Sequence, residues 1–302
     1  MADKPLKVTT IGTFDGVHIG HQKILQRVQK LAESQDYESA VLTLFPHPRM
    51  VLFGDESIKL LNTIDERVEI LKSFGIKHVI VKEFTKQFAN LSADDYVKDV
   101  LIDELNSKRV VIGYDHHFGK GRSANITDLK AFSKLYDFEV EEISAQDIED
   151  VTVSSTKIRS ALEDGEVNVA NAYLGYNFFI TGSVIKGNKI GRTIDFPTAN
   201  IYIEERYKLI PKDGVYVVRS KHNGTVLFGM MNIGTNPTVN GVSKSVEVHF
   251  FDFDQDIYGE TFKIEFLKRL RDERKFENLE ALKLQLKEDM KAANLYIEEG
   301  HD

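Results

Sequence analysis

The sequence contains no cysteine among its 302 residues. A disulfide framework, a thiolate nucleophile and a cysteine metal site are therefore excluded. It also contains no apolar run approaching the roughly 18 residues that a membrane-spanning helix needs. The N-terminal stretch MADKPLKVTT lacks the apolar core of a signal peptide. These absences predict a soluble, cytoplasmic protein with no membrane partner.

An excess of basic residues is missing too, because the formal net charge is −8. This argues against a nucleic-acid partner, whose phosphates favour a basic face. Binding of small phosphorylated ligands is not excluded, since such ligands need only a local cluster of hydrogen-bond donors. The chain is 42% hydrophobic and 28% charged, so it can form ordinary cores in one large domain or two domains of average size. A homo-oligomer is compatible with this composition.

The first part of the chain, residues 1–165, alternates short apolar runs with helical patterns. The helical patterns include residues 22–35 and residues 63–74, where Thr63 and Glu66 form a capping-box pattern. The apolar runs are KVTTIG, SAVLTLF, KHVIVKEF, KRVVIGY and FEVEEI. Strand and helix in alternation predict an α/β domain with a parallel sheet covered by helices on both faces.

From about residue 178 the pattern changes to strands joined by turns. The predicted strands are FFITGSVI, TANIYI, GVYVVRS, TVLFGMMNI, KSVEVHFFDF and FKIEFLKRL. HNG at 222–224 predicts a tight hairpin turn, because Asn-Gly tolerates positive φ. We therefore expect an all-β domain, a six-stranded antiparallel barrel. A terminal helix near 277–298 follows, with an apolar stripe formed by Leu279, Leu282, Leu286, Met290, Ala293 and Ile297. The predicted domains are 1–178 and 179–302.

The stretch TIGTFDGVHIGH connects the first predicted strand to the first helix. Ligands bind at the carboxyl ends of parallel strands, and a helix N-terminus attracts phosphate. His18 and His21 lie three apart on one helical face, so both can point at one anion. Two solvated turn histidines are the alternative interpretation. The motif GTFDGVHIGH, placed on the first strand-turn-helix unit of a parallel sheet, resembles that of the HxGH nucleotidyltransferase superfamily, which has a Rossmann-like fold.

A second stretch, VSSTKIRSAL, places two hydroxyls and an arginine at the start of a helix after the fifth strand. This arrangement is an anion cradle or, alternatively, an ordinary helix cap with a surface arginine. In the superfamily that this chain resembles, the corresponding motif holds the triphosphate. The resemblance implies that role for Ser155, Thr156 and Arg159.

The second half carries GSVIKGNKIGRTIDFPTANIYI, whose glycines suit a flexible flap over phosphates. Thr198 and Asn200 are two residues apart on an extended segment and so face the same way. Hydroxyl and amide oxygens are hard ligands that suit Mg²⁺. In SVEVHFFDF, Glu247 shares a face with His249 and Phe251, and we expect this face to be the barrel interior. A carboxylate there needs a task, such as that of a general base. Turn residues and a solvated strand face are the alternative.

Together GRTIDFPTAN, GVYVV, MNIGTNPTV and EVHFFDF resemble the riboflavin kinase family. A flavin kinase behind an HxGH adenylyltransferase resembles the bifunctional riboflavin kinase/FMN adenylyltransferase family, the prokaryotic FAD synthetases. LTLFPHP, LLNTIDERVEIL and IGYDHHFGKGR agree with it. The resemblance implies that the barrel converts riboflavin and ATP to FMN, and that the first domain converts FMN and a second ATP to FAD and pyrophosphate.

The resemblance also assigns site residues. Glu247 is the base of the kinase, and Thr198 and Asn200 hold Mg²⁺. In the kinase domain, the residues expected to bind ATP are Gly182, Lys186, Gly187, Gly191, Arg192, Thr198 and Asn200. In the adenylyltransferase domain, the residues expected to bind ATP are Gly12, Phe14, Asp15, Gly16, His18, His21, Ser155, Thr156 and Arg159. Among these, His18, His21 and Arg159 are expected to be catalytic. The flavin is expected at Phe45, Pro46, His47, Pro48, Asp115 and Phe118.

Two positions depart from the family pattern. His117 stands where arginine is common, and Asp195 stands where glycine is usual. Histidine lacks the permanent charge and bidentate fork of arginine, which puts a phosphate contact there in doubt. Three other functions stay open: a chain with only one working site, an HxGH transferase for a different acceptor, and a flavin-binding regulator. A mere binder would not need the base and the metal ligands together.

Overall fold

The computed structural model describes residues 5–55, 57–113, 116–143, 153–186, 196–238 and 241–300, although the side chains of 236–238 and 241–243 are not included. The chain divides into two compact units, residues 1–155 and 156–302. The domain boundary expected at 178/179 stays a prediction. Within the described residues no helix is both long and apolar enough to cross a membrane.

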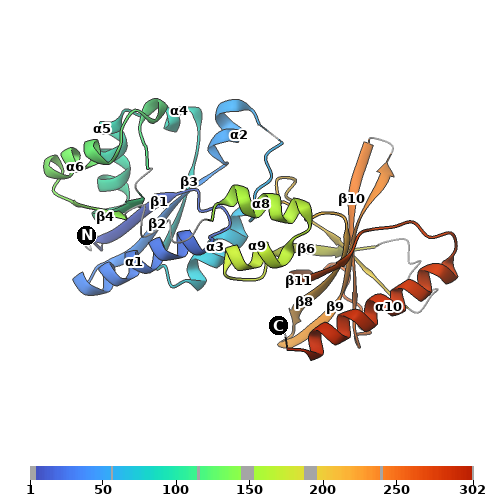
Figure 1. Ribbon diagram of the computed structural model, residues 1–302. Coiled ribbons are helices and arrows are strands. Elements are labelled where there is room, and N and C mark those ends of the chain that lie inside the picture. Colours follow the sequence, from blue (N-terminus) through green and yellow to red (C-terminus); the bar gives the residue numbers. More distant parts are fainter. Residues whose placement is uncertain are drawn as a thin grey trace. The chain divides into compact units, whose positions relative to one another are not determined.

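The first unit is built on a parallel five-stranded sheet of order β3-β2-β1-β4-β5 (Figure 1). All neighbouring pairs run parallel, as the alternating sequence pattern predicts. β1 lies between β2 and β4, so the strand order reverses there, and ligands of open α/β sheets bind at such a point. The strands are β1 (Lys7–Gly12), β2 (Glu38–Phe45), β3 (His78–Glu83), β4 (Ser107–Gly113) and β5 (Glu139–Ile143).

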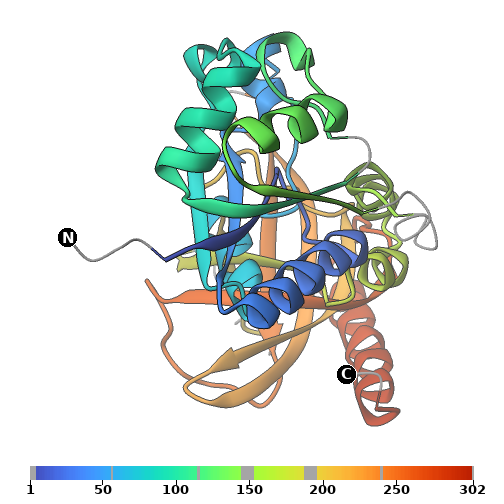
Figure 2. The same ribbon diagram turned by 90° about the vertical axis from the view of Figure 1, so that its left-hand side faces the viewer.

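Helices cover both faces of this sheet, which confirms the expected layers (Figures 1 and 2). A π-helix and α6 cover one face of the sheet. Val97 and Leu101 of the π-helix and Leu129 of α6 form a buried cluster there with the strand residues Ile11 and Val110. α1 and α3 contact strands from the other face. The helical segments are α1 (Ile19–Gln35), α2 (Pro48–Phe53), α3 (Ile64–Ser73), α4 (Lys86–Ala89), α5 (Ala93–Asp95), the π-helix η1 (Tyr96–Glu104), the 3-10 turn η2 (Lys120–Arg122) and α6 (Ile126–Leu135).

The second unit contains a closed barrel of order β10-β7-β6-β11-β8-β9, with every described pair antiparallel. The six expected strands are therefore confirmed. They are β6 (Phe179–Ile185), β7 (Ala199–Tyr202), β8 (Gly214–His222), β9 (Thr225–Thr238), β10 (Gly241–Phe250) and β11 (Thr261–Arg271). Asn223 and Gly224 have φ values of 48° and 83°, as the predicted hairpin turn between β8 and β9 requires.

In the described part of the second unit, three helices accompany the barrel: α8 (Ser155–Asp164), α9 (Val167–Leu174) and α10 (Leu279–Glu298). α9 was not among the elements predicted from the sequence. Its Asn171 fastens it to the barrel, since Nδ2 donates to the carbonyl of Phe266 at 2.9 Å. Most of the expected stripe of α10 packs on the barrel, and Ala293 is fully buried. Leu279 is the exception, because it is 52% exposed at the first turn of the helix.

Candidate active sites

The two histidines of the first motif lie against one another at the start of α1. His18 is the N-cap residue, and its Nδ1 accepts the backbone N–H of His21 at 3.4 Å. Their rings stack with centroids 3.7 Å apart. A Cβ on Gly20 would lie 3.3 Å from the His18 ring, so the small residue lets this ring lie close to the helix. A neutral His18 in this arrangement carries its proton on Nε2, where it can be donated.

The turn before the histidines is strained. Phe14 and Val17 have φ values of 48° and 37°, a left-handed conformation that costs of order 1–3 kcal/mol at each non-glycine residue. The Phe14 ring lies 5.0 Å from that of His21 and covers Gly12, where a Cβ would lie 3.1 Å from it. The structure thus brings together the histidines and the expected residues of the turn.

Part of the expected ATP-binding backbone is already engaged by the protein. The N–H of Gly16 donates to Asn62 Oδ1 at 2.9 Å. The Asp15 carboxylate is buried, accepts the N–H of Leu61 at 2.9 Å and lies 3.8 Å from Arg67 Nη2. Asn62 and Arg67 are site neighbours that the sequence analysis did not single out. The capping-box pattern at Thr63 marked this helix start but gave no sign that it meets the turn.

Burial lowers the pKa of His18 from 6.5 to about 4, and nearby Asp15 opposes this shift. Burial also lowers the pKa of His21, and the neighbouring His18 and Arg67 lower it further. Both rings are therefore neutral near pH 7. They can donate hydrogen bonds to phosphate oxygens without carrying a permanent charge.

These pKa shifts predict an acid-sensitive N-terminal unit. The unfolded chain protonates His18 near pH 6.5 and the folded chain near pH 4, so stability is full above 6.5 and is lost as the pH falls through this window. At about 1.4 kcal/mol per pKa unit, His18 alone contributes about 3 kcal/mol. His18→Asn keeps a helix cap without titrating. We expect urea unfolding to give a smaller difference between pH 7 and pH 4 for this variant than for the wild type; equal differences would contradict the prediction.

The hydroxyl-rich motif reaches the same turn. Ser155 Oγ donates to the backbone carbonyl of Asp15 at 2.9 Å. This contact joins two segments that are 140 residues apart in the chain. Thr156 and Arg159 follow on the first turns of α8, in the second unit. Their role as phosphate ligands stays a prediction.

The residues expected at the flavin have different surroundings. Phe45 ends β2, His47 caps α2 by accepting the N–H of Arg49 at 3.2 Å, and Pro48 opens that helix. With Pro46, which follows a cis peptide bond, they are half-buried at the carboxyl edge of the sheet. Phe118, however, is only 5% exposed and packs 5.4 Å from the Tyr96 ring in the core. Asp115 lies outside the described residues.

The expected kinase residues meet on neighbouring strands of the barrel. Glu247 of β10 pairs with Asn200 of β7, and Thr198 Oγ1 donates to Glu247 Oε2 at 3.1 Å. Lys186 is exposed just after β6. Gly187, Gly191, Arg192 and the departure Asp195 lie outside the described residues.

Glu247 does not face the barrel interior, contrary to the expectation. Val246, Val248 and Phe250 are the buried residues of β10, at 5% exposure or less. Glu247 is half-buried on the opposite face, which it shares with Phe251, and Phe251 packs against the cluster under α10. The alternation of side chains along β10 was predicted correctly, but the Glu247 carboxylate lies on the outer face of the barrel wall. It needs no buried partner there and can be reached by a substrate.

Gly182 has a packing reason to be glycine. A Cβ there would lie 2.6 Å from Ile201 Cγ2 and 2.7 Å from the carbonyl oxygen of Tyr202. We expect Gly182→Ala to lower the free energy of unfolding by about 1–3 kcal/mol, because the adjacent backbone cannot yield cheaply. The half-exposed neighbour offers a control, Ser183→Ala, which should change stability little. Weakened ATP binding with unchanged thermal stability would instead assign Gly182 to the nucleotide.

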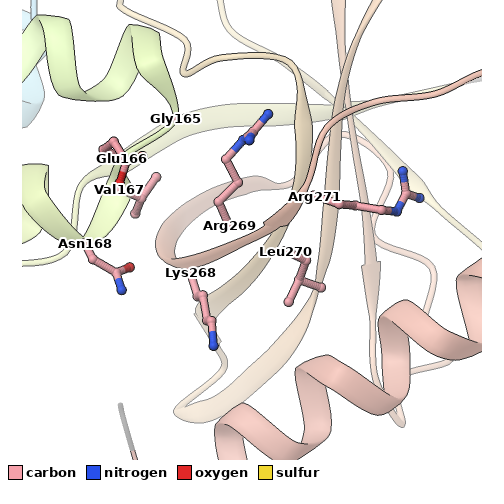
Figure 3. Close-up of a pocket in the computed structure, with 8 residues that line it drawn as sticks. All are labelled: Gly165, Glu166, Val167, Asn168, Lys268, Arg269, Leu270 and Arg271. Carbon is pink, nitrogen blue, oxygen red and sulfur yellow. The ribbon is translucent and has the colours of Figure 1, made fainter.

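A separate hollow of about 230 Å³ lies beside the α8–α9 turn (Figure 3). Its cations do not converge, because Lys268, Arg269 and Arg271 point in different directions. Arg269 pairs with Asp272 at 2.6 Å, and Arg271 pairs with Asp289 at 2.7 Å. The expected site residues do not line this hollow.

Comparison with known proteins agrees with both halves. The family model of FAD synthetase matches residues 1–157, and that of riboflavin kinase matches residues 174–297. A bifunctional riboflavin kinase/FMN adenylyltransferase of Listeria monocytogenes is 40% identical over 94% of this chain and 90% of its own. The corresponding protein of Bacillus subtilis is 38% identical over 96% and 92%.

Among solved structures, one described as a macrolide-efflux protein from Streptococcus pneumoniae superposes with a TM-score of 0.87. It is 34% identical, and the match covers 97% of this chain and 95% of that one. The two family models lie in the order that the sequence motifs predict, and together they span nearly the whole chain. The chain therefore belongs to the bifunctional riboflavin kinase/FMN adenylyltransferase family, with an FAD synthetase domain followed by a riboflavin kinase domain.

Proposed function

We propose that Glu247 is the general base of riboflavin phosphorylation. The terminal ribityl hydroxyl attacks the γ-phosphorus of ATP, its proton passes to the carboxylate, and ADP leaves. The contact between Thr198 and Glu247, 49 residues apart in the chain, supports this assignment most strongly. Because Thr198 donates to one carboxylate oxygen, it orients the other toward the hydroxyl. Glu247 is half-buried on the outer wall, where a substrate can reach it.

Mg²⁺ fits the oxygens beside this base. The Thr198 hydroxyl and the Asn200 amide offer hard neutral ligands, and Asn200 pairs directly with Glu247. The described residues contain no group of three His, Cys, Asp or Glu that could hold a metal. The ion would therefore share its coordination with ATP phosphates and water, as Mg²⁺ commonly does. When bound, it would neutralise charge on the transferred phosphoryl group.

In the first unit, the FMN phosphate attacks the α-phosphorus of ATP, and pyrophosphate leaves. We propose that the neutral rings of His18 and His21 donate hydrogen bonds to the phosphoryl oxygens on which charge develops. Ser155 lies beside the same turn, which supports its place at the phosphates. Thr156 and Arg159 would extend this anion site, and the FPHP turn at 45–48 would contact the flavin.

The partners that follow are small molecules: riboflavin, FMN and ATP as substrates, with FAD as the final product. A cytoplasmic location, a homo-oligomer and the absence of nucleic-acid and membrane partners stay predictions.

A product assay tests the proposal. The purified chain is incubated with riboflavin, ATP and Mg²⁺, and the flavins are separated over time. We expect FMN first and FAD afterwards. FMN alone would mean that the first unit is silent or serves another acceptor, with His117 as the first suspect. No conversion would favour a flavin-binding regulator instead.

A further inference from the structure

The turn that carries the histidines is fastened to the start of α3 by two buried side chains. Asp15 is 1% exposed, and its carboxylate accepts the N–H of Leu61 at 2.9 Å. Asn62 is 0% exposed, and its Oδ1 accepts the N–H of Gly16 at 2.9 Å. The two hydrogen bonds run in opposite directions, so each segment holds the other. Gly16 is only two residues before His18.

The α3 side of this contact is firmly anchored. Thr63 caps the helix by accepting the N–H of Glu66, and the Glu66 carboxylate accepts the N–H of Thr63 in return. Arg67, one turn along the helix, donates to Thr43 Oγ1 at 3.2 Å and thus reaches β2. The cap stabilises the helix, and the Arg67 contact with β2 fixes the position of the segment that carries Asn62.

The turn itself needs to be held. Phe14 and Val17 keep left-handed φ values on either side of Gly16. Such backbone persists only where the surroundings impose it, and it is typical of functional sites. Asn62 accepts a hydrogen bond from the backbone N–H of Gly16, one of the two residues between them.

Stability alone does not explain an asparagine at this position. Its Nδ2 is buried and has no hydrogen-bond partner among the residues that the structure describes. A buried donor without a partner is unfavourable, so the amide is kept at a cost for the sake of the contact that its Oδ1 makes with Gly16. Residues that break a local rule in this way tend to serve function.

We propose that Asn62 is a positioning residue for adenylyl transfer. Its Oδ1 holds Gly16 in place and so keeps His18 and His21 directed at the phosphates. This inference rests on the proposed function of the site.

The test compares two neighbouring substitutions on the full chain. In Asn62→Ala, kcat for FAD formation from FMN should fall about 10–100-fold, because small misplacements of catalytic groups have large effects. The KM for ATP should change much less, and riboflavin phosphorylation by the same chain should be unchanged. The matched control is Thr63→Ala, which removes the adjacent helix cap and lowers the melting temperature but leaves the Arg67 contact with β2 and the Asn62 contact with Gly16. Its kcat should match the wild type.

A second measurement does not depend on activity. In the ligand-free protein, NMR titration should move the pKa of His18 in Asn62→Ala from about 4 back toward 6.5, since the ring loses its buried position. It should stay low in Thr63→Ala.

The proposal is overturned if Asn62→Ala keeps its kcat, if both variants lose activity equally, or if the His18 titration is unchanged. Should Asn62→Ala leave the first unit unfolded, Asn62→Ser applies the same test, because its oxygen is one bond too short to reach Gly16. A wild-type chain that forms no FAD would refute the proposed function itself, which is a separate result.

Discussion

Glu247→Gln is expected to abolish FMN formation while leaving FAD synthesis from supplied FMN intact. Glutamine has the shape of glutamate and can still accept the hydrogen bond from Thr198, but it cannot take the proton of the attacking hydroxyl. Loss of a general base typically slows a reaction by about 10²–10⁴-fold. Steady-state rates with riboflavin, and separately with FMN, measure the two effects in one preparation.

Glu260 provides a matched control on the same barrel, because it is an exposed carboxylate just before β11 with His222 as its neighbour. Glu260→Gln should phosphorylate riboflavin at the wild-type rate. Normal FMN formation by Glu247→Gln would rule out Glu247 as the base. A loss that is accompanied by a large drop in melting temperature would point to packing on the outer wall instead.

His21→Ala is expected to have the opposite effect: FAD formation is lost and FMN formation is kept. His21 stacks on His18 and lies beside Phe14, so its ring belongs to the turn at the carboxyl end of β1. Removing one preorganised donor from a developing negative charge typically costs about 10²–10³-fold in kcat. The assay supplies FMN and ATP and follows FAD and pyrophosphate.

His78 of β3 serves as the control, because its ring pairs with Glu38 at the far end of the strands. His78→Ala should synthesise FAD normally. Undiminished FAD formation by His21→Ala would remove this residue from the mechanism. Loss of both activities would indicate either that the two domains are coupled or that the variant is misfolded.

Much of the first site could be predicted from sequence because its parts are local. Strand, turn and helix follow one another within residues 7–35, and the HxGH spacing places both rings on one face. The contact of Asn62 with Gly16 could not be predicted in this way. It joins residues 46 apart in the chain, and only the packing of α3 against the sheet brings them together.

The barrel shows the same division. Six strands, the Asn-Gly turn and the alternation that separates Glu247 from Val246 and Val248 could be predicted from residue order, since side chains on a strand alternate with a period of two. Which of the two strand faces lies inside the barrel depends on contacts between distant segments. Barrel closure turned the valines inward, and α10 covered part of the outer wall that Glu247 shares. Periodicity tells which side chains lie together, whereas the partner that buries a face comes from distant parts of the chain.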